Sequence, residues 1–244
     1  MNLGIQNHNF LITGASRGIG RAIAVSLLNE GANVWLVARG QVQLEQTVDE
    51  LRQKYGEDRV IAWTTDCADE VAMDELCHKL TQQWERLDGV IANVGDGRSV
   101  LDALPDADQW SKVWQINFET ALNTARVFLP LLQESRGNLL FISSITGLEA
   151  IGAPIDYSTA KTAVIAFAQN LARKVAPEVR VNVIAPGNVH FPRSSWEEKI
   201  QTDPKIIEQM LQTKVPMNAL ELRKKLRMQL FFSAPHGPLS LLVL

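Results

Sequence analysis

A tyrosine and a lysine spaced four residues apart, Tyr157 and Lys161, form the pair in this sequence best suited to proton transfer. On a helix, residues i and i+4 project from the same face, so the phenol and the ammonium would lie close together. A phenol with its usual pKa of about 10 is a weak acid at neutral pH. We expect the ammonium to stabilise the phenolate and to lower the pKa of Tyr157. The same spacing also arises by chance on many helices.

Two further features accompany this pair. Ser144 lies thirteen residues before Tyr157, directly after the apolar run 139–142, and a glycine-rich turn spans Thr13 to Gly20. The short apolar run before that turn predicts a strand, and the residues after it predict a helix. A strand, a glycine turn and a helix in succession place backbone N–H groups and a helix N-terminus beside a phosphate. The N-terminal segment therefore predicts a dinucleotide-binding unit.

The composition predicts one globular domain. The chain has 244 residues, of which 46% are hydrophobic, and a net charge of −3, so it can bury one core and offers no broad basic surface for nucleic acid. Its two cysteines, Cys67 and Cys77, match no metal-ligand or disulfide spacing. The N-terminus has no apolar signal segment, and no apolar run reaches the ~18–20 residues of a membrane span. We expect a cytoplasmic protein with no metal, nucleic-acid or membrane partner.

Alternating apolar runs and helical patterns predict a single doubly wound, Rossmann-type α/β domain with a mostly parallel sheet. Six strands are expected, at residues 9–13, 33–39, 60–65, 87–92, 138–143 and 179–185. Helices are expected at residues 21–30, 41–55, 70–84 and 106–132, and from Tyr157 to about residue 175. Ser144 would then follow the end of its strand, at the edge of the sheet where such folds bind ligands.

The turn T-G-x-x-x-G-x-G, the serine and the Tyr-x-x-x-Lys pair together resemble the classical short-chain dehydrogenase/reductase (SDR) family, over about residues 9–218. The resemblance implies hydride transfer between a nicotinamide cofactor and a carbonyl or secondary alcohol. It implies that Ser144 binds the carbonyl oxygen, Tyr157 donates the proton and Lys161 also holds the nicotinamide ribose. Asn117 would link that lysine to water through its backbone carbonyl; a buried packing amide is the alternative. The pattern looks closest to 3-oxoacyl-carrier-protein reductases.

The resemblance also implies a set of cofactor-binding residues. The set is Gly14, Ser16, Arg17, Gly18, Ile19, Gly20, Arg39, Asp66, Cys67, Asn93, Gly95, Tyr157, Lys161, Pro186, Gly187 and Val189. Asp66 would bind the adenine, although a turn role at the strand end fits it equally well. The sequence departs from the family at Phe191, where relatives often carry a threonine that binds the nicotinamide amide.

The end of the second strand distinguishes the two nicotinamide cofactors. An acidic residue there would bind the ribose 2′-hydroxyl, whereas an arginine would pair with a 2′-phosphate. Ala38 stands at the acidic position and Arg39 follows it, while Arg17 lies in the glycine turn. These residues predict NADP(H). The alternatives are two solvated surface arginines and an NAD-dependent alcohol dehydrogenase.

The resemblance ends near Asn218. Residues 1–218 would form the NADP-binding domain, with a lid at about 190–214, and substrate choice is expected to lie in that lid and in the loop 145–156. Residues 219–244 form an atypical tail, explained either by a single-base deletion that shifts the reading frame or by a divergent ending. We expect the seventh strand of the sheet to be missing, which would expose a sheet edge.

The tail also bears on assembly and activity. A homo-oligomer, a dimer or a tetramer, is expected if the C-terminal interface survives. The alternative to an active enzyme is a truncated remnant of the family that is inactive or only binds nucleotide.

Overall fold

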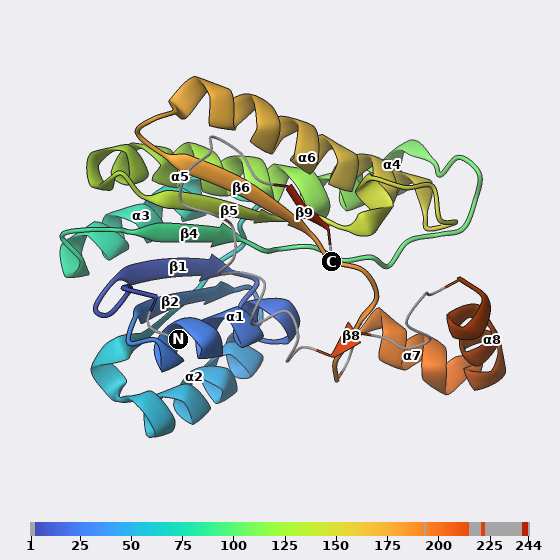
Figure 1. The fold of residues 1–244 in the computed structure, drawn as a ribbon, viewed down its shortest axis with the longest axis horizontal. Helices are drawn as coiled ribbons and strands as arrows, with labels where there is room; N and C mark the ends of the chain where they lie inside the picture. Colours follow the sequence, from blue (N-terminus) through green and yellow to red (C-terminus); the bar gives the residue numbers. More distant parts are fainter. Residues whose placement is uncertain (1–2, 193, 215–220, 223–240, 244) are drawn as a thin grey trace.

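The computed structural model describes residues 3–192, 194–214, 221–222 and 241–243. Figure 1 shows one twisted sheet with helices packed on both of its faces. The strand order is β3-β2-β1-β4-β5-β6-β9, and every pairing is parallel. The strands are β1 (Asn9–Thr13), β2 (Asn33–Ala38), β3 (Val60–Thr64), β4 (Gly89–Ala92), β5 (Asn138–Ile142), β6 (Arg180–Ala185) and β9 (Leu241–Val243). The prediction of a doubly wound Rossmann-type domain is confirmed.

Helices and short turns connect these strands. The helices are α1 (Gly18–Asn29), α2 (Gln41–Tyr55), α3 (Glu70–Gln83), α4 (Ala107–Trp114), α5 (Thr120–Ser135), α6 (Ile155–Val175), α7 (Ser195–Thr202) and α8 (Pro204–Lys214). The 3-10 turns are η1 (Glu57–Arg59) and η3 (Ile145–Gly147), and a π-helical turn, η2, spans Gln115–Glu119. A separate parallel pair joins β7 (Val189–His190) to β8 (Glu221–Leu222).

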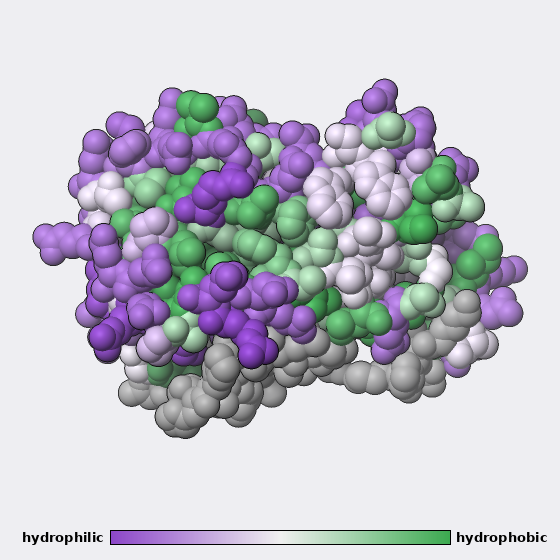
Figure 2. All heavy atoms as spheres, turned by 90° about the horizontal axis from the view of Figure 1, so that it is seen from above, coloured by the Kyte–Doolittle hydropathy of each residue, from purple (hydrophilic) through white to green (hydrophobic). Residues whose placement is uncertain are grey.

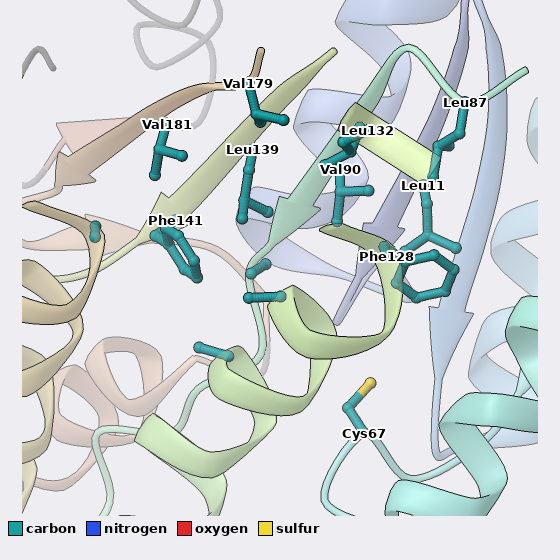
Figure 3. Packing of buried hydrophobic residues seen from close by; sticks show 14 of the residues in the cluster. Leu11, Cys67, Leu87, Val90, Phe128, Leu132, Leu139, Phe141, Val179 and Val181 are labelled. Carbon is teal, nitrogen blue, oxygen red and sulfur yellow. The ribbon is translucent and has the colours of Figure 1, made fainter. Parts of the chain in front are cut away.

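Two apolar clusters fill the space between the sheet and its helices. Successive strand residues point to opposite faces, so Leu11 belongs to one cluster and Ile12 to the other. The first cluster includes Phe128 of α5 and Phe141 of β5. Figure 3 shows both rings among side chains of the neighbouring strands. Because both faces are buried, the strands appear in the sequence as continuous apolar runs and do not alternate.

The long helix predicted at residues 106–132 is present, with a local change of winding. Asp106 caps α4 by accepting a hydrogen bond from the backbone N–H of Gln109 at 2.8 Å. The π-helical turn η2 then separates α4 from α5 and contains Asn117. Single π-helical turns inside α-helices are frequent at functional sites, and this one gives an asparagine a place in the middle of a helix.

The prediction of a missing seventh strand is wrong. Strand β9 pairs in parallel with β6, with Leu241 opposite Val183 and Val243 opposite Ala185. The outer edge of β6 presents backbone N–H and C=O groups, and a short apolar segment near the end of the chain pairs with them. The hypotheses of a shifted reading frame and of a divergent ending concern residues 219–244, which mostly lie outside the described residues.

Candidate active site

A cavity of about 550 Å³ lies at the carboxyl ends of the parallel strands, where doubly wound folds bind ligands. Its lining residues are Gly14, Ser16, Arg17, Gly18, Ile19, Ala38, Arg39, Gly40, Gln43, Thr65, Asp66, Cys67, Asn93, Val94, Gly95, Asp96, Gly97, Arg98, Ile142, Ser143, Ser144, Tyr157, Lys161, Pro186, Gly187, Val189, Phe191, Ser194 and Trp196. The structure thus brings the predicted catalytic and cofactor-binding residues to one place, except that Gly20 and Asn117 do not line the cavity.

The glycine turn is built as a close-packed anion cradle. Gly14 and Gly18 have φ angles of +63° and +59°, in the left-handed region that favours glycine. The side-chain amide of Asn93 donates to the carbonyls of Thr13 and Gly14, each at 3.0 Å, and ties the turn to the end of β4. A Cβ at Gly20 would lie 2.5 Å from the Gly14 carbonyl oxygen, so Gly20 allows the close packing of α1 behind the turn. The N-terminus of α1 therefore faces the cavity and suits a phosphate.

The second arginine of the cofactor prediction, Arg39, follows β2 and lines the same cavity as Arg17. Arg39 is paired with Asp66, with 3.4 Å between Nη1 and Oδ2, and both side chains are about half exposed. The other oxygen of Asp66 accepts a hydrogen bond from the backbone N–H of Ala68 at 3.0 Å, so this carboxylate also shapes the turn after β3. Cys67 is buried, and burial raises the pKa of its thiol to about 12, which keeps it neutral.

The serine and the tyrosine are brought into contact at the ends of β5 and α6. The hydroxyl of Ser144 lies close enough to that of Tyr157 to influence its pKa. Thr146 donates its hydroxyl proton to Ser144 Oγ at 3.1 Å. Lys161 is buried, and its Nζ donates to the carbonyl oxygen of Ile142 at 3.2 Å. Two hydroxyls and an ammonium therefore converge beside the glycine turn.

The electrostatics of the pair differ from the prediction. Burial raises the pKa of Tyr157, the hydrogen bond from Ser144 opposes that rise, and the negative charge of Asp96 adds to it. Burial also lowers the pKa of Lys161 to about 8, and its Nζ lies 6.0 Å from the centroid of the Tyr157 ring. The prediction that Lys161 lowers the pKa of Tyr157 is therefore wrong for this geometry. The phenol is held in its protonated form, which suits a proton donor.

The side chain of Asn117 binds the backbone of the loop that follows β4. Its Oδ1 accepts a hydrogen bond from the backbone N–H of Asp96 at 2.9 Å, and its Nδ2 donates to the carbonyl of Asp96 at 3.0 Å. A Cβ at Gly95 would lie 2.7 Å from Lys161 Nζ and 3.1 Å from Asn117 Oδ1, so glycine leaves room for both groups. The side chain is thus a buried packing amide, and the water link through its backbone carbonyl stays a prediction.

The loop after β4 supplies cavity residues that sequence reasoning missed: Asp96, Gly97 and Arg98. A Cβ at Gly97 would lie 3.6 Å from the ring carbon of Tyr157 that bears the hydroxyl. Arg98 binds Asp96 with one guanidinium nitrogen and Glu198 of α7 with two others, at 3.0 and 2.6 Å. Their position directly after the Asn93–Gly95 motif was the one available signal. The loop 145–156, predicted to wall the cavity, contributes none of its lining residues.

The lid segment approaches the cavity through β7 and α7. Ser194 caps α7 by accepting from the backbone N–H of Glu197 at 3.1 Å, and both Ser194 and Trp196 line the cavity. The ring of Phe191 packs on the glycine turn, because a Cβ at Gly18 would lie 2.8 Å from its Cζ. An aromatic ring therefore lies against the N-terminus of α1.

In the described part of the chain, no group of three or more His, Cys, Asp or Glu side chains could hold a metal ion. No helix found there is both long and apolar enough to cross a membrane.

Comparison with known proteins agrees with the fold. The family model described as short chain dehydrogenase matches residues 8–201. An uncharacterized oxidoreductase of Staphylococcus aureus (strain USA300) is 35% identical over 181 residues, which are 73% of this chain and 77% of that protein. The Pseudomonas aeruginosa RhlG/NADP active-site complex has a TM-score of 0.89 and 27% identity, over 100% of this chain and 96% of that one. An NAD+-bound xylitol dehydrogenase also has a TM-score of 0.89, with 23% identity and 98% of each chain covered. The chain belongs to the short-chain dehydrogenase/reductase family of oxidoreductases.

Proposed function

We propose that the protein is an NADP(H)-dependent oxidoreductase that interconverts a carbonyl and a secondary alcohol. The observation that carries the proposal is the convergence of Ser144, Tyr157 and Lys161 beside the glycine turn in one cavity. The cavity fits a dinucleotide, because its turn has the positive φ angles and the helix N-terminus that a pyrophosphate requires. The cofactor, when bound, supplies or accepts the hydride.

The side chains then have separate tasks in the reductive direction. Ser144 hydrogen-bonds the carbonyl oxygen, where negative charge develops during reduction. Tyr157 donates the proton to that oxygen, because its phenol is protonated at neutral pH and lies beside Ser144. Lys161 holds the ribose of the cofactor, and its pKa of about 8 keeps it largely charged at pH 7. Asn117 connects this lysine to solvent.

Preference for NADP(H) is proposed from two arginines that line the cavity, Arg17 and Arg39. The ion pair between Arg39 and Asp66 is long, at 3.4 Å, and half exposed. Such a pair contributes little, so Arg39 is able to exchange its partner for a 2′-phosphate, which accepts charge-assisted hydrogen bonds. The complex of the related RhlG with NADP supports this choice. The fold alone does not decide the cofactor, because the NAD+-bound xylitol dehydrogenase shares it.

The direct test is oxidation of NADPH in the presence of carbonyl compounds. 3-Oxoacyl thioesters are the first class to assay, because the sequence pattern looks closest to reductases of that class. Tyr157→Phe should reduce turnover by at least about a hundredfold, as expected for loss of a general acid, while NADPH binding is retained. Tyr55→Phe is the matched control, since Tyr55 binds Asn29 on the outside of the molecule. Equal turnover in wild type and Tyr157→Phe would refute the proposal.

We further propose a cytoplasmic homo-oligomer. Figure 2 shows apolar side chains gathered across the middle of the face on the α6 side, with hydrophilic side chains around them. An apolar centre within a polar rim is the pattern of a protein–protein contact surface. Analytical ultracentrifugation of the purified protein tests this, and a monomer at micromolar concentration would contradict it.

A further inference from the structure

A buried carboxylate directly precedes the catalytic tyrosine in the chain. Asp156 is only 1% exposed. Its Oδ1 accepts the backbone N–H of Tyr157 at 2.7 Å, and its Oδ2 accepts the hydroxyl of Ser99 at 2.5 Å. Gln109 of α4 in turn donates its side-chain amide to Ser99 Oγ at 3.0 Å. A carboxylate this deeply buried is costly unless its oxygens are hydrogen bonded, and both oxygens are bonded here.

Asp156 also lies at the start of the catalytic helix, in the first turn of α6. Through Ser99 and Gln109, this one side chain joins the start of α6 to the loop after β4 and to α4. Three elements that surround the proposed site are therefore fastened at one buried point.

The loop after β4, residues 96–99, is held at both of its ends, and we call it the clamped loop. Asn117 grips the backbone of Asp96 through two hydrogen bonds, and Asp156 grips Ser99. Between these two points, Gly97 lies against the ring of Tyr157. The clamped loop thus forms a wall of the cavity in direct contact with the phenol.

We propose that Asp156 is a positioning residue for the hydride-transfer reaction, because it fixes the start of the catalytic helix and the clamped loop relative to each other. The inference rests on the proposed function of the site. When both are fixed, the hydroxyl of Tyr157 stays directed at Ser144 and at the bound carbonyl. Misplacement of a catalytic group by about 1 Å costs on the order of a hundredfold in rate, so a loose helix start would lower kcat with little change in cofactor binding.

Two substitutions of Asp156 separate position from charge. In Asp156→Asn, the new side-chain amide oxygen accepts the hydrogen bond from the backbone N–H of Tyr157, and the new NH2 group donates to the hydroxyl oxygen of Ser99. The hydroxyl of Ser99 then donates to the side-chain oxygen of Gln109, whose amide group is rotated by about 180°. The network is kept and the charge is lost, so we expect kcat within about threefold of wild type. Asp156→Ala removes both contacts, and we expect kcat to fall about 10- to 100-fold with the NADPH Kd changed by less than about twofold. Ser99→Ala, which deletes one hydroxyl, should give an intermediate loss of kcat.

A spectroscopic readout makes the test independent of turnover. The protein has two tyrosines, so incorporation of fluorotyrosine gives two fluorine NMR resonances, one from Tyr157 and one from Tyr55. We expect Asp156→Ala to move or broaden the Tyr157 resonance, and Asp156→Asn to leave it in place. The Tyr55 resonance should stay unchanged in both variants, which reports an intact fold.

The outcomes distinguish the two claims. If the wild-type protein reduces no carbonyl, the proposed function is refuted. If the Tyr157 resonance nevertheless moves in Asp156→Ala, the positioning role is supported. Unchanged kcat and an unchanged resonance in Asp156→Ala would overturn the positioning role, as would an equal loss of kcat in Asp156→Asn. If Asp156→Ala does not fold, Ser99→Ala decides: a lower kcat at constant NADPH Kd supports the role, and an unchanged kcat overturns it.

Discussion

Replacing Lys161 by methionine should stabilise the protein at pH 7 while it abolishes turnover. Lys161 is fully buried, and burial lowers the pKa of its ammonium from 10.5 to about 8. This lowering of the pKa corresponds to roughly 3 kcal/mol of unfavourable free energy for holding the charged form in the folded state. Methionine has a similar length and no charge, but it leaves the Ile142 carbonyl without this donor, at a cost of about 1–3 kcal/mol. The net expected gain in the free energy of unfolding is therefore about 0–2 kcal/mol.

The pH dependence of this gain has a definite sign. Below pH 8, Lys161 is charged in both the folded and the unfolded protein, and the burial penalty is complete. Between pH 8 and pH 10.5 the unfolded chain binds the proton more tightly than the folded protein, so the stability of wild type rises with pH. Lys161→Met lacks this group, and its advantage should shrink across the same window.

Urea unfolding of both proteins at several pH values from 6.5 to 9.5 measures this difference. Other titrating groups are shared, and their contributions largely cancel between wild type and variant. A Lys161→Met protein that is less stable than wild type at pH 7, or a difference that does not change with pH, would refute the assignment of a desolvated lysine.

Three further changes test other parts of the site. Phe191→Thr should tighten NADPH binding several-fold, because it removes the ring that packs on Gly18 at the N-terminus of α1; weaker binding in a titration would show that the ring belongs to the cofactor site. Glu198→Gln should raise the substrate KM, because it weakens the contact of α7 with Arg98. The expected increase is at most about fivefold, which is the range for an exposed ion pair. Glu208→Gln on α8 is the control with the same charge change. The kcat for reduction should decrease as pH rises through about 8, since Lys161 loses its charge there; a flat profile from pH 7 to pH 9 contradicts that role.

The sequence predicted the parts of the site that depend on short local patterns. The glycine turn, Ser144 and the Tyr157–Lys161 pair each follow from a strand end or a helix turn, and parallel strands bring their carboxyl ends to one edge. The clamped loop was missed because its role comes from contacts far along the chain, such as Arg98 with Glu198, one hundred residues away. Local sequence patterns do not predict contacts between residues so far apart in the chain.

Three other differences have physical causes of the same kind. The π-helical turn at Asn117 shifts the helical period by about one residue, which an apolar rhythm over residues 106–132 cannot resolve. The segment Leu241–Val243 is a short apolar run without a family motif around it, and its pairing depends on the open edge of β6. The direction of the pKa of Tyr157 likewise depends on burial that the helix spacing alone does not reveal.

We propose that this chain uses NADP(H), with Arg17 and Arg39 binding the 2′-phosphate. The most direct measurement is a fluorescence titration with NADPH and with NADH, since Trp196 lines the cavity and reports binding. We expect saturable binding, with NADPH bound at least about tenfold more tightly than NADH, which corresponds to about 1.4 kcal/mol. We also expect Arg39→Ala to lose this preference. Equal affinity for the two cofactors in wild type, or no saturable binding of either, would contradict it.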